Sequence, residues 1–492
     1  MFTIGYDVGS SSIKAVLFDV LAGIPVASVT VPDTEMPIDA PQPGWAEQSP
    51  LMWWEYVQQA TRKLLAQAPQ VPPQAIRGIG IAYQMHGLVL TDENAYPLRS
   101  AIIWCDSRAV AIGERAFAAL GTQACLQRLL NSPGNFTASK LRWVIEHEPS
   151  IYERAYRMML PGDFIAFRMT GKATTTASGL SEGALWDFQN NEPSEQLITY
   201  YHIRRELIPE LVPTLGWQGA LTAEAANLLG LAPNTPVTYR AGDQPNNAFA
   251  LRVLNPGEIA ATAGTSGVVY GVSETATPDP QMRFNTFLHV NHQPAQPRLG
   301  ALLCVNGTGS LNAWLRRNLC PELSYTAMNE LAASVPVGAQ GVRIYPFGNG
   351  AERMLGNCNV GARIKGLQFS THTRAHVLRA AQEGIVFALW YGMKAMQQAG
   401  IQLATIRAGH ANMFLSPLFG QTLADLSGAT IELYNTDGAQ GAARGAAIGA
   451  GLVSLEEAFS QLQCICRIVP NTERQSQLQQ IYAEWEEVIW EN

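Results

Sequence analysis

Residues 4–18 read IGYDVGSSSIKAVLF, and residues 259–272 read IAATAGTSGVVYGV. Each stretch has an apolar run, a turn of glycine and hydroxyl residues, and a second run rich in β-branched residues. This pattern predicts a β-hairpin in both places. The strands are expected at residues 2–7, 13–20, 258–263 and 268–272. The two stretches indicate either a duplicated structural unit or a chance match between two short hairpins.

Further strands and amphipathic helices alternate along the chain. The expected strands are 25–31, 76–83, 101–104, 235–239, 404–408 and 430–434. The expected helices are 53–68, 139–148, 161–169, 376–399, 416–426 and 438–451. Alternation of this kind predicts an α/β fold. The helix at 438–451 is rich in small residues, so it either packs closely on a neighbour or presents its N-terminal amides to a ligand.

The chain length favours two domains. A chain of 492 residues exceeds what one hydrophobic core usually organises. The turn Asn255-Pro256-Gly257 marks a boundary near residues 245–255. We therefore expect a first domain over residues 1–248 and a second over residues 249–492.

Composition excludes several classes of function. Hydrophobic residues make up 47% and charged residues 15% of the chain, which is typical of a globular enzyme. The net charge is -7 and no run of lysine and arginine occurs, so nucleic acid is not an expected partner. An anionic ligand would have to be held locally, by backbone amides and a metal ion.

The cysteines and the N-terminus indicate a cytoplasmic protein without a membrane span. Seven cysteines are scattered along the chain without a CxxC pair, and we interpret them as buried thiols in a reducing compartment. The opening MFTIGYDVG lacks the basic and apolar regions of a signal peptide. No apolar run reaches about 18 residues, the length that a transmembrane helix requires.

The turns of the two hairpins are candidate phosphate-binding sites. Gly9, Ser10 and Ser11 form the first turn, and Gly264 and Thr265 begin the second. Glycine lets backbone amides approach a phosphate closely, and the hydroxyl groups add donors. The alternative is that each turn only reverses the chain. Lys14, three residues after the first turn, either reaches a phosphate or lies on the surface.

Asp7 is a candidate metal ligand. It ends an otherwise apolar strand, where a buried carboxylate is costly unless it is paired or binds a metal. Mg²⁺ prefers one or two carboxylates together with water and phosphate oxygens. The alternative is that Asp7 caps its own turn.

Asp243 is a candidate general base. It follows the strand at 235–239, in the predicted loop Ala241-Gly242-Asp243-Gln244-Pro245. A carboxylate at that place can take a proton from an attacking hydroxyl. Next to Pro245 it is equally interpretable as a residue that only forms a turn.

Two further strand ends carry candidate substrate-binding residues. Gln84, Met85 and His86 follow the strand at 76–83, and Trp104, Asp106 and Arg108 follow the strand at 101–104. Polar side chains with an aromatic residue nearby are typical of a sugar pocket in an open α/β fold. For His86, the alternative is a buried histidine whose hydrogen bonds are satisfied within the core.

The sequence resembles the FGGY carbohydrate kinases of the hexokinase/actin superfamily over nearly its whole length. Besides the opening stretch, the residues that carry the resemblance are WAEQSPLMWW (45–54), IGIAYQMHG (79–87), IIWCDSR (102–108), FTASKLRWVIEHEP (136–149), LPGDFIAFRMTG (160–171), AGDQ (241–244), ATAGTSG (261–267), DLSGATIE (425–432) and GAARGAAIGAG (441–451). Each motif alone is weak, but their common order is specific to the family. The motifs QMHG, WAEQ and WCDSR are most similar to the xylulokinase branch.

The resemblance implies two actin-like, ribonuclease H-like domains that flank a catalytic cleft for ATP, Mg²⁺ and a sugar. It implies that Asp243 is the catalytic base and that Asp7 acts at the metal ion and the phosphates. Met85, His86 and Gln244 would contact the sugar. The residues that would bind the nucleotide are Gly264, Thr265, Gly307, Gly409 and Asn412.

The activity implied is phosphorylation of D-xylulose to D-xylulose 5-phosphate. Two departures from the family pattern leave the sugar and the nucleotide open: Gln244 stands where these kinases carry Asn, and Ala408-Gly409-His410 replaces a Gly-rich loop. The alternatives are a kinase for ribulose, L-xylulose or glycerol, and a non-catalytic sugar or nucleotide sensor on the same fold. The size of the chain is typical of enzymes that form homodimers.

Overall fold

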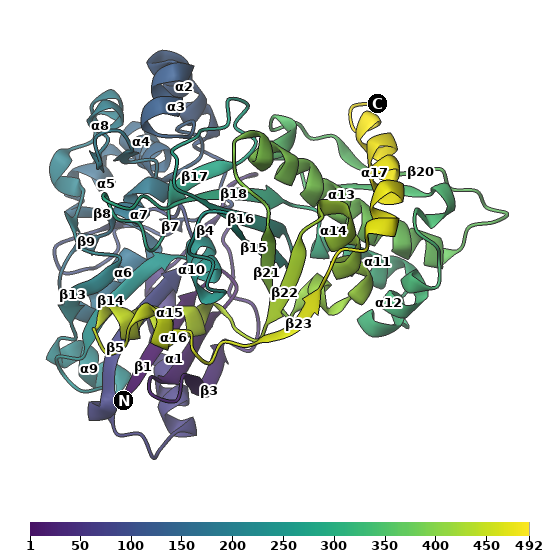
Figure 1. The fold of residues 1–492 in the computed structure, drawn as a ribbon. Helices are drawn as coiled ribbons and strands as arrows, with labels where there is room; N and C mark the ends of the chain where they lie inside the picture. The colour runs from purple at the N-terminus through teal and green to yellow at the C-terminus, as the bar shows by residue number, and fades with distance from the viewer. Residues whose placement is uncertain (492) are drawn as a thin grey trace. The chain divides into compact units, whose positions relative to one another are not determined.

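The computed structural model describes residues 1–491 and divides the chain into two compact units (Figure 1). The first unit comprises Met1–Arg252, Phe287–Leu299 and Thr436–Leu462. The second comprises Val253–Thr286, Gly300–Asn435 and Gln463–Asn492, of which Asn492 is outside the described residues. The expected division after residue 248 therefore misses two later segments that belong to the first unit.

The first unit begins with a three-stranded meander, β1-β2-β3. The strands of the whole unit are β1 (Phe2–Val8), β2 (Ile13–Asp19), β3 (Ile24–Val31), β4 (Glu47–Gln48), β5 (Ile76–Tyr83), β6 (Val89–Thr91), β7 (Ala101–Ile102), β8 (Arg157–Met159), β9 (Thr174–Thr175), β10 (Trp186–Asp187), β11 (Glu192–Pro193), β12 (Glu210–Leu211), β13 (Leu215–Ala220) and β14 (Pro236–Gly242). Its helices are α1 (Pro50–Gln67), α2 (Val110–Leu120), α3 (Thr122–Arg128), α4 (Thr137–His147), α5 (Pro149–Arg154), α6 (Pro161–Thr170), α7 (Ala177–Glu182), α8 (Glu195–Tyr201), α9 (Ala223–Leu229), α10 (Asp243–Ala250), α15 (Gly438–Gly449) and α16 (Leu455–Ala458).

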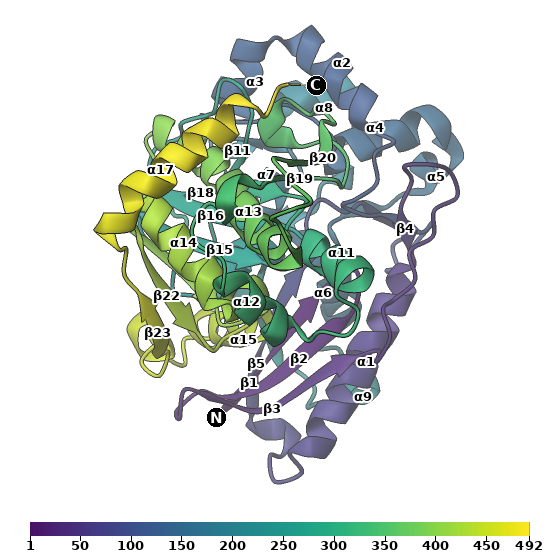
Figure 2. The ribbon, with the colours of Figure 1, turned by 90° about the vertical axis from the view of Figure 1, so that its right-hand side faces the viewer.

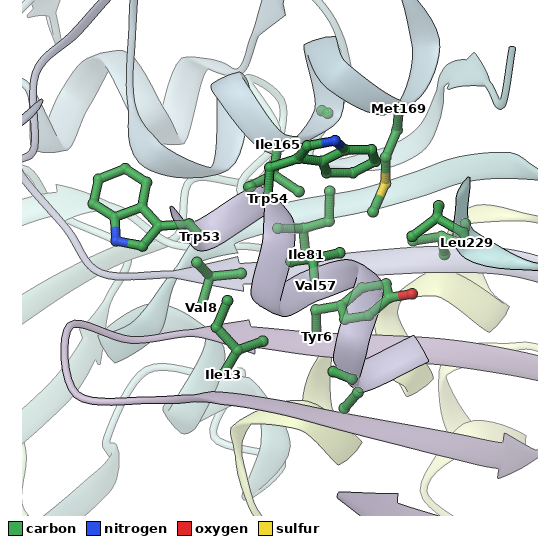
Figure 3. Packing of buried hydrophobic residues seen from close by; sticks show 14 of the residues in the cluster. Tyr6, Val8, Ile13, Trp53, Trp54, Val57, Ile81, Ile165, Met169 and Leu229 are labelled. Atoms are coloured by element: carbon green, nitrogen blue, oxygen red, sulfur yellow. The ribbon is translucent and has the colours of Figure 1, made fainter. Parts of the chain in front are cut away.

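The main sheet of the first unit has the strand order β13-β14-β5-β1-β2-β3. Strands β1, β2 and β3 are antiparallel neighbours, whereas β5 and β14 run parallel to β1. Because side chains alternate along a strand, Tyr6 and Val8 point to one face of the sheet, and Gly5 and Asp7 to the other. Figure 3 shows Tyr6 and Val8 in the core that lies between the sheet and α1, with Trp53, Val57 and Ile81 around them.

Helix α15 lies directly on the opposite face of this sheet (Figure 1). A Cβ atom at Gly5 would lie 2.0 Å from the carbonyl oxygen of Ala439, and one at Gly80 would lie 2.0 Å from that of Ala442. Only glycine permits backbones to approach so closely. Of the two interpretations of the small-residue helix, close packing on a neighbour is the one that the structure supports, and it explains why residues 436–462 belong to the first unit.

Gly80→Ala is expected to destabilise the protein by about 3 kcal/mol or more, because the new methyl group must displace the backbone of α15. Gly78→Ala is the matched control on the same face of β5. A Cβ atom there would lie 3.2 Å from its nearest neighbours, so a loss of only about 1 kcal/mol is expected. Urea unfolding of the two variants measures the difference. Equal stabilities of the two variants would show that the backbone of α15 does not pack tightly against Gly80.

The second unit repeats the meander and adds a layer of helices. Its strands are β15 (Glu258–Ala263), β16 (Gly267–Ser273), β18 (Leu299–Val305), β19 (Arg343–Phe347), β20 (Gly361–Lys365), β21 (Thr405–Gly409), β22 (Thr430–Tyr434) and β23 (Cys464–Ile468), and β17 (Asn285–Leu288) lies where the chain passes to the first unit. Its helices are α11 (Gly309–Leu319), α12 (Tyr325–Ala333), α13 (Arg374–Gln398), α14 (Pro417–Ser427) and α17 (Thr472–Glu487). Helices α13, α14 and α17 pack side by side (Figure 2).

The two units share one strand order. The sheet of the second unit runs β17-β18-β16-β15-β21-β22-β23. In it the hairpin β15-β16 takes the place of β1-β2, and the parallel strands β21 and β22 take the places of β5 and β14. The prediction of a duplicated unit is thus confirmed at the level of topology.

Two expectations of the sequence are corrected by the structure. Cys105, Cys358, Cys464 and Cys466 are exposed rather than buried, although all seven cysteines are free thiols. Strand β14 continues through Gly242, so Asp243 begins a helix and does not lie in a loop. Within residues 1–491, no helix is long and apolar enough to cross a membrane.

Candidate active site

Asp7 lies at the end of β1, in a position that disfavours its charge. The pKa of the Asp7 carboxyl is raised to about 6, mainly by burial; Lys14 opposes this shift, and the nearby carboxylate of Asp437 contributes to it. Lys14 is directly opposite Asp7 in the β1-β2 register. A Cβ atom at Gly438 would lie 2.3 Å from Oδ2 of Asp7, so the start of α15 closes one side of the carboxyl group.

Asp243 is the first residue of α10, immediately after the strand β14 that neighbours β5. Burial raises the pKa of its carboxyl to about 7, and repulsion from Asp7 contributes to the same shift. Hydrogen bonds from the backbone and side chain of Gln244 act in the opposite direction. A carboxyl group whose pKa is close to neutral is suited to accept a proton and release it. The side chain of Gln244, expected at the sugar, thus interacts with Asp243 itself.

The residues that follow β5 form a wall of the candidate site next to Asp7 and Asp243. Gln84 is buried and donates a hydrogen bond from Nε2 to Gln48 Oε1 at 3.3 Å. Gln48 in turn donates to the carbonyl oxygen of Ser10 at 2.7 Å, which ties this wall to the Gly9-Ser10-Ser11 turn. Met85 packs against Gly242, the residue before Asp243. The structure therefore brings Gln84, Met85 and the first turn to the same end of the sheet as Asp7 and Asp243.

His86 is held in an unusual backbone conformation, with φ of 63°. Its Nδ1 lies 2.8 Å from the carbonyl oxygen of Glu182, and its ring contacts Phe136 and Phe287. Lys140 donates a hydrogen bond of 2.8 Å to the His86 carbonyl oxygen. Burial lowers the pKa of Lys140 to about 7. A left-handed residue fixed from several sides is typical of a functional site.

The residues after β7 divide into an exposed aromatic side chain and a buried ion pair. Trp104 is 51% exposed, and its Nε1 lies 3.3 Å from Ser10 Oγ. Arg108 binds Asp106 through Nε and Nη2, and its guanidinium group lies 3.8 Å from the ring of Trp45. Both charged side chains are almost fully buried. This packing favours a supporting role for Asp106 and Arg108, whereas Trp104 is accessible to a ligand.

The first turn is fixed by its surroundings. The amide of Gly9 donates to the Ser12 carbonyl oxygen at 3.1 Å, and the Ser11 carbonyl oxygen accepts from Met36 at 2.8 Å. The hydroxyl groups of this turn, its other backbone amides and Lys14 are polar groups that a phosphate could meet. Among residues 1–491, no cluster of three or more His, Cys, Asp or Glu side chains suits a metal ion. A site built from Asp7 alone, completed by phosphate and water, fits the way in which proteins hold Mg²⁺.

The second unit contains a pocket of about 850 Å³. Its wall includes Gly264 and Thr265 from the second turn, Asn412, and the first residues of α11. The amides of Gly309 and Ser310 donate to the carbonyl oxygens of Gly264 and Thr265 at 2.8 and 3.0 Å. Such a volume accommodates a ligand of nucleotide size.

Gly307 and Gly409, also expected at the nucleotide, are not among the residues that line this pocket. A Cβ atom at Gly307 would lie 1.4 Å from the carbonyl oxygen of Pro346, so this glycine allows two backbones to touch. Gly409 ends β21 beside Tyr434 of β22. Their expected roles at the nucleotide stay predictions, with a structural reason for glycine at position 307.

Three residues that sequence reasoning did not identify belong to this site. Glu182 ends α7 beside Gly242, Lys140 holds His86, and Asp437 caps α15 next to Asp7. Only Asp437 had a local signal, as an N-cap residue before a run of small helix formers. Glu182 and Lys140 reach the site through contacts far apart in sequence, which no local pattern reveals.

The first unit holds a buried pair of carboxyl groups beside a hydroxyl-rich turn, and the two units share one strand order. This arrangement fits an actin-like phosphotransferase that acts on a hydroxyl group. Comparison with known proteins agrees with this class. The N-terminal domain of the FGGY family of carbohydrate kinases matches residues 2–250, and its C-terminal domain matches residues 259–453. The chain belongs to the FGGY family of carbohydrate kinases, which use ATP.

Individual relatives cover the full chain. The sequence is 30% identical to a xylulose kinase of Haemophilus influenzae over 98% of both chains. The crystal structure of the Rhodospirillum rubrum xylulose kinase has a TM-score of 0.87 at 26% identity, covering 99% of this chain and 98% of that one. The crystal structure of Plasmodium falciparum glycerol kinase with ADP has a TM-score of 0.88 at 19% identity. The match covers 100% of this chain and 98% of that one, so the two proteins share the fold.

Proposed function

We propose that this kinase transfers the γ-phosphate of ATP to the terminal hydroxyl of D-xylulose, yielding D-xylulose 5-phosphate and ADP. The observation that carries the proposal is Asp243, a carboxyl group at a helix start with a pKa of about 7 beside Asp7. The similarity to xylulose kinases supports the choice of sugar.

In the proposed reaction, the ionised Asp243 takes the proton of the acceptor hydroxyl while that oxygen attacks the γ-phosphorus. The bond from phosphorus to the bridging oxygen of ATP breaks, and ADP leaves. Met85, His86 and Trp104 would contact the sugar. The turn at Gly9-Ser10-Ser11 and Lys14 would hold the transferred phosphate.

Asp7 would hold Mg²⁺, which supplies positive charge to the phosphates when it is bound. The nucleotide would occupy the pocket lined by Gly264, Thr265 and Asn412. We assign sugar and phosphate binding to residues 1–248 together with the returning helix α15, and nucleotide binding to the later part of the chain.

A panel of acceptors in a coupled assay for ADP release tests the proposed function. D-xylulose is expected to give the highest kcat/KM among D-xylulose, D-ribulose, L-xylulose and glycerol. A second candidate, a kinase for another ketose or polyol, is favoured by Gln244, because its side chain is committed to Asp243. Good turnover of another acceptor with none of D-xylulose would select that candidate. Absence of turnover with the whole panel would favour a sensor.

The rate is expected to fall tenfold per pH unit on the acid side of neutrality. Asp243 must be ionised to accept a proton, and burial together with Asp7 raises its pKa to about 7. The value of kcat/KM should therefore rise with pH up to about 7 and level off above it. Initial rates between pH 5 and 9 at saturating ATP measure this limb. A rate independent of pH between 5 and 7 would contradict the role of Asp243.

A further inference from the structure

Glu182 places a third carboxyl group beside Asp243. It is the last residue of α7 and is only 1% exposed. A Cβ atom built on Gly242 would lie 2.3 Å from Oε2 of Glu182 and 2.6 Å from Cγ of Met85. Gly242 directly precedes Asp243, and the backbone carbonyl of Glu182 contacts the ring of His86. The carboxyl group of Glu182 therefore lies among the residues expected to bind the acceptor.

One oxygen of this carboxyl group lacks a hydrogen bond within residues 1–491. Oε1 of Glu182 is buried and makes no hydrogen bond among the described residues, and the same holds for the hydroxyl of Tyr83, which lies near this carboxyl group. Burial raises the pKa of Glu182 well above its usual value, and the charge of Asp243 raises it further. The groups that favour its charged form, the Tyr83 phenol and the backbone amide of His86, are neutral.

A nearby carboxylate shows what a structural role would require. Asp163, on α6, accepts hydrogen bonds from Thr175 at 2.8 Å and from the Leu160 amide at 3.2 Å. It also pairs with Arg240 at 2.9 Å. Both carboxyl groups are buried, but of the two only Asp163 forms an ion pair with a cation within residues 1–491. A buried polar atom without a partner lowers stability, so the position of Glu182 requires another explanation.

We propose that Glu182 is a specificity-determining residue whose Oε1 forms a hydrogen bond with a second hydroxyl of the acceptor, beside the hydroxyl that Asp243 activates. A carboxyl group bonds a hydroxyl in either protonation state, as acceptor when ionised and as donor when neutral. This inference rests on the proposed kinase activity and specifies its substrate class further. With Asp7, Asp243 and Glu182 together, the acceptor is a neutral polyhydroxylated compound, because a sugar acid would bring a fourth carboxyl group.

The test compares Glu182→Gln and Glu182→Ala with the wild type, using D-xylulose or the best acceptor of the panel. We expect KM for the acceptor to increase at least about tenfold in Glu182→Ala, the effect of one lost hydrogen bond to a buried group, and less in Glu182→Gln, which keeps a bonding amide. KM for ATP should stay within about twofold. D-gluconate should not be phosphorylated by the wild type.

Thermal unfolding without ligands separates this role from a structural one. Glu182→Gln is expected to keep or raise the Tm, because it removes an uncompensated buried carboxyl group. Asp163→Asn, the control, is expected to lower the Tm by at least about 5 °C, because it leaves Arg240 buried without its anion. A loss of Tm in Glu182→Gln similar to that of Asp163→Asn would overturn the proposal.

The other possible results distinguish a failure of the Glu182 proposal from a failure of the proposed function. Unchanged acceptor KM in both Glu182 variants, with an active wild type, would overturn the role of Glu182 and leave the kinase activity standing. Phosphorylation of D-gluconate by the wild type would overturn the substrate class. If the wild type rejects D-xylulose and phosphorylates another neutral polyol, the proposed sugar is wrong and the same variants test Glu182 on that polyol.

Discussion

Asp243→Asn is expected to lower kcat by at least about 10²-fold and, at the same time, to make the folded protein more stable at neutral pH. The rate falls because an amide cannot accept the proton of the attacking hydroxyl, and a positioned general base contributes about 10²–10⁴-fold. KM for ATP should change little, since Asp243 belongs to the first unit and the pocket around Thr265 to the second.

The gain in stability follows from the raised pKa of Asp243. The pKa of this aspartate is near 3.8 in the unfolded chain and about 7 in the folded protein. A group of this kind contributes its stability below the unfolded pKa and loses it as the pH rises from about 4 to 7. At pH 8 the wild type therefore carries a penalty of roughly 2–4 kcal/mol that Asp243→Asn removes.

Urea unfolding at pH 8 and at pH 5 measures this difference, which should shrink at the lower pH. Asp19→Asn is a suitable control, because the Asp19 carboxylate accepts hydrogen bonds from Leu21 and Ala22 in a turn and not in a catalytic cluster. It should leave kcat within about twofold of the wild type. Near-normal turnover in Asp243→Asn would remove Asp243 from the mechanism.

Three carboxyl groups of the first unit are buried at a cost in stability and lie where function requires them. Asp7, Asp243 and Glu182 each have a raised pKa, and burial is the largest cause in every case. Repulsion between neighbours adds to the effect of burial, because the charge of Asp7 raises the pKa of Asp243 and the charge of Asp243 raises the pKa of Glu182. Such clusters mark functional sites more often than structural ones.

Local sequence predicted the elements of the fold well where one pattern repeats. Both hairpins, strand β5 and helix α13 lie where alternation or helical periodicity placed them, because their apolar faces contact neighbours close in the chain or form one continuous stripe. The two glycine and hydroxyl turns left a duplicated unit and a chance match open, and the strand order common to the two units supports the duplication. The hairpins, β5 and α13 could be predicted because their patterns are local.

Long-range packing accounts for what the sequence did not reveal. Residues 436–462 fold onto the first sheet because Gly5 and Gly80 leave room for α15, a match between segments more than 300 residues apart. The burial of Arg108 beside Trp45 likewise depends on a contact that periodicity does not encode. Glu182 had no motif of its own, and only the fold brings it to Gly242.

Asp7→Asn is expected to lower kcat by about 10²-fold and to increase the Mg²⁺ concentration for half-maximal rate at least tenfold. An amide keeps the shape of the side chain but loses the negative charge that a hard cation prefers. In the same variant the pKa of Asp243 should fall, because the repulsion from Asp7 is one of the causes that raise it. The acid limb of the residual rate should therefore move to lower pH.

Titration of the rate with MgCl₂ at fixed ATP, repeated between pH 5 and 9, measures both effects on one variant. Lys14→Met provides a contrast on the opposite strand, since Lys14 lowers the pKa of Asp7 and its loss should leave the Mg²⁺ requirement within about twofold. An Asp7→Asn enzyme with an unchanged Mg²⁺ requirement would assign the metal ion to other groups. The charge of Asp7 is expected to affect both the binding of Mg²⁺ and the pKa of Asp243. An acid limb that stays near pH 7 in Asp7→Asn would therefore show that Asp7 does not raise the pKa of Asp243.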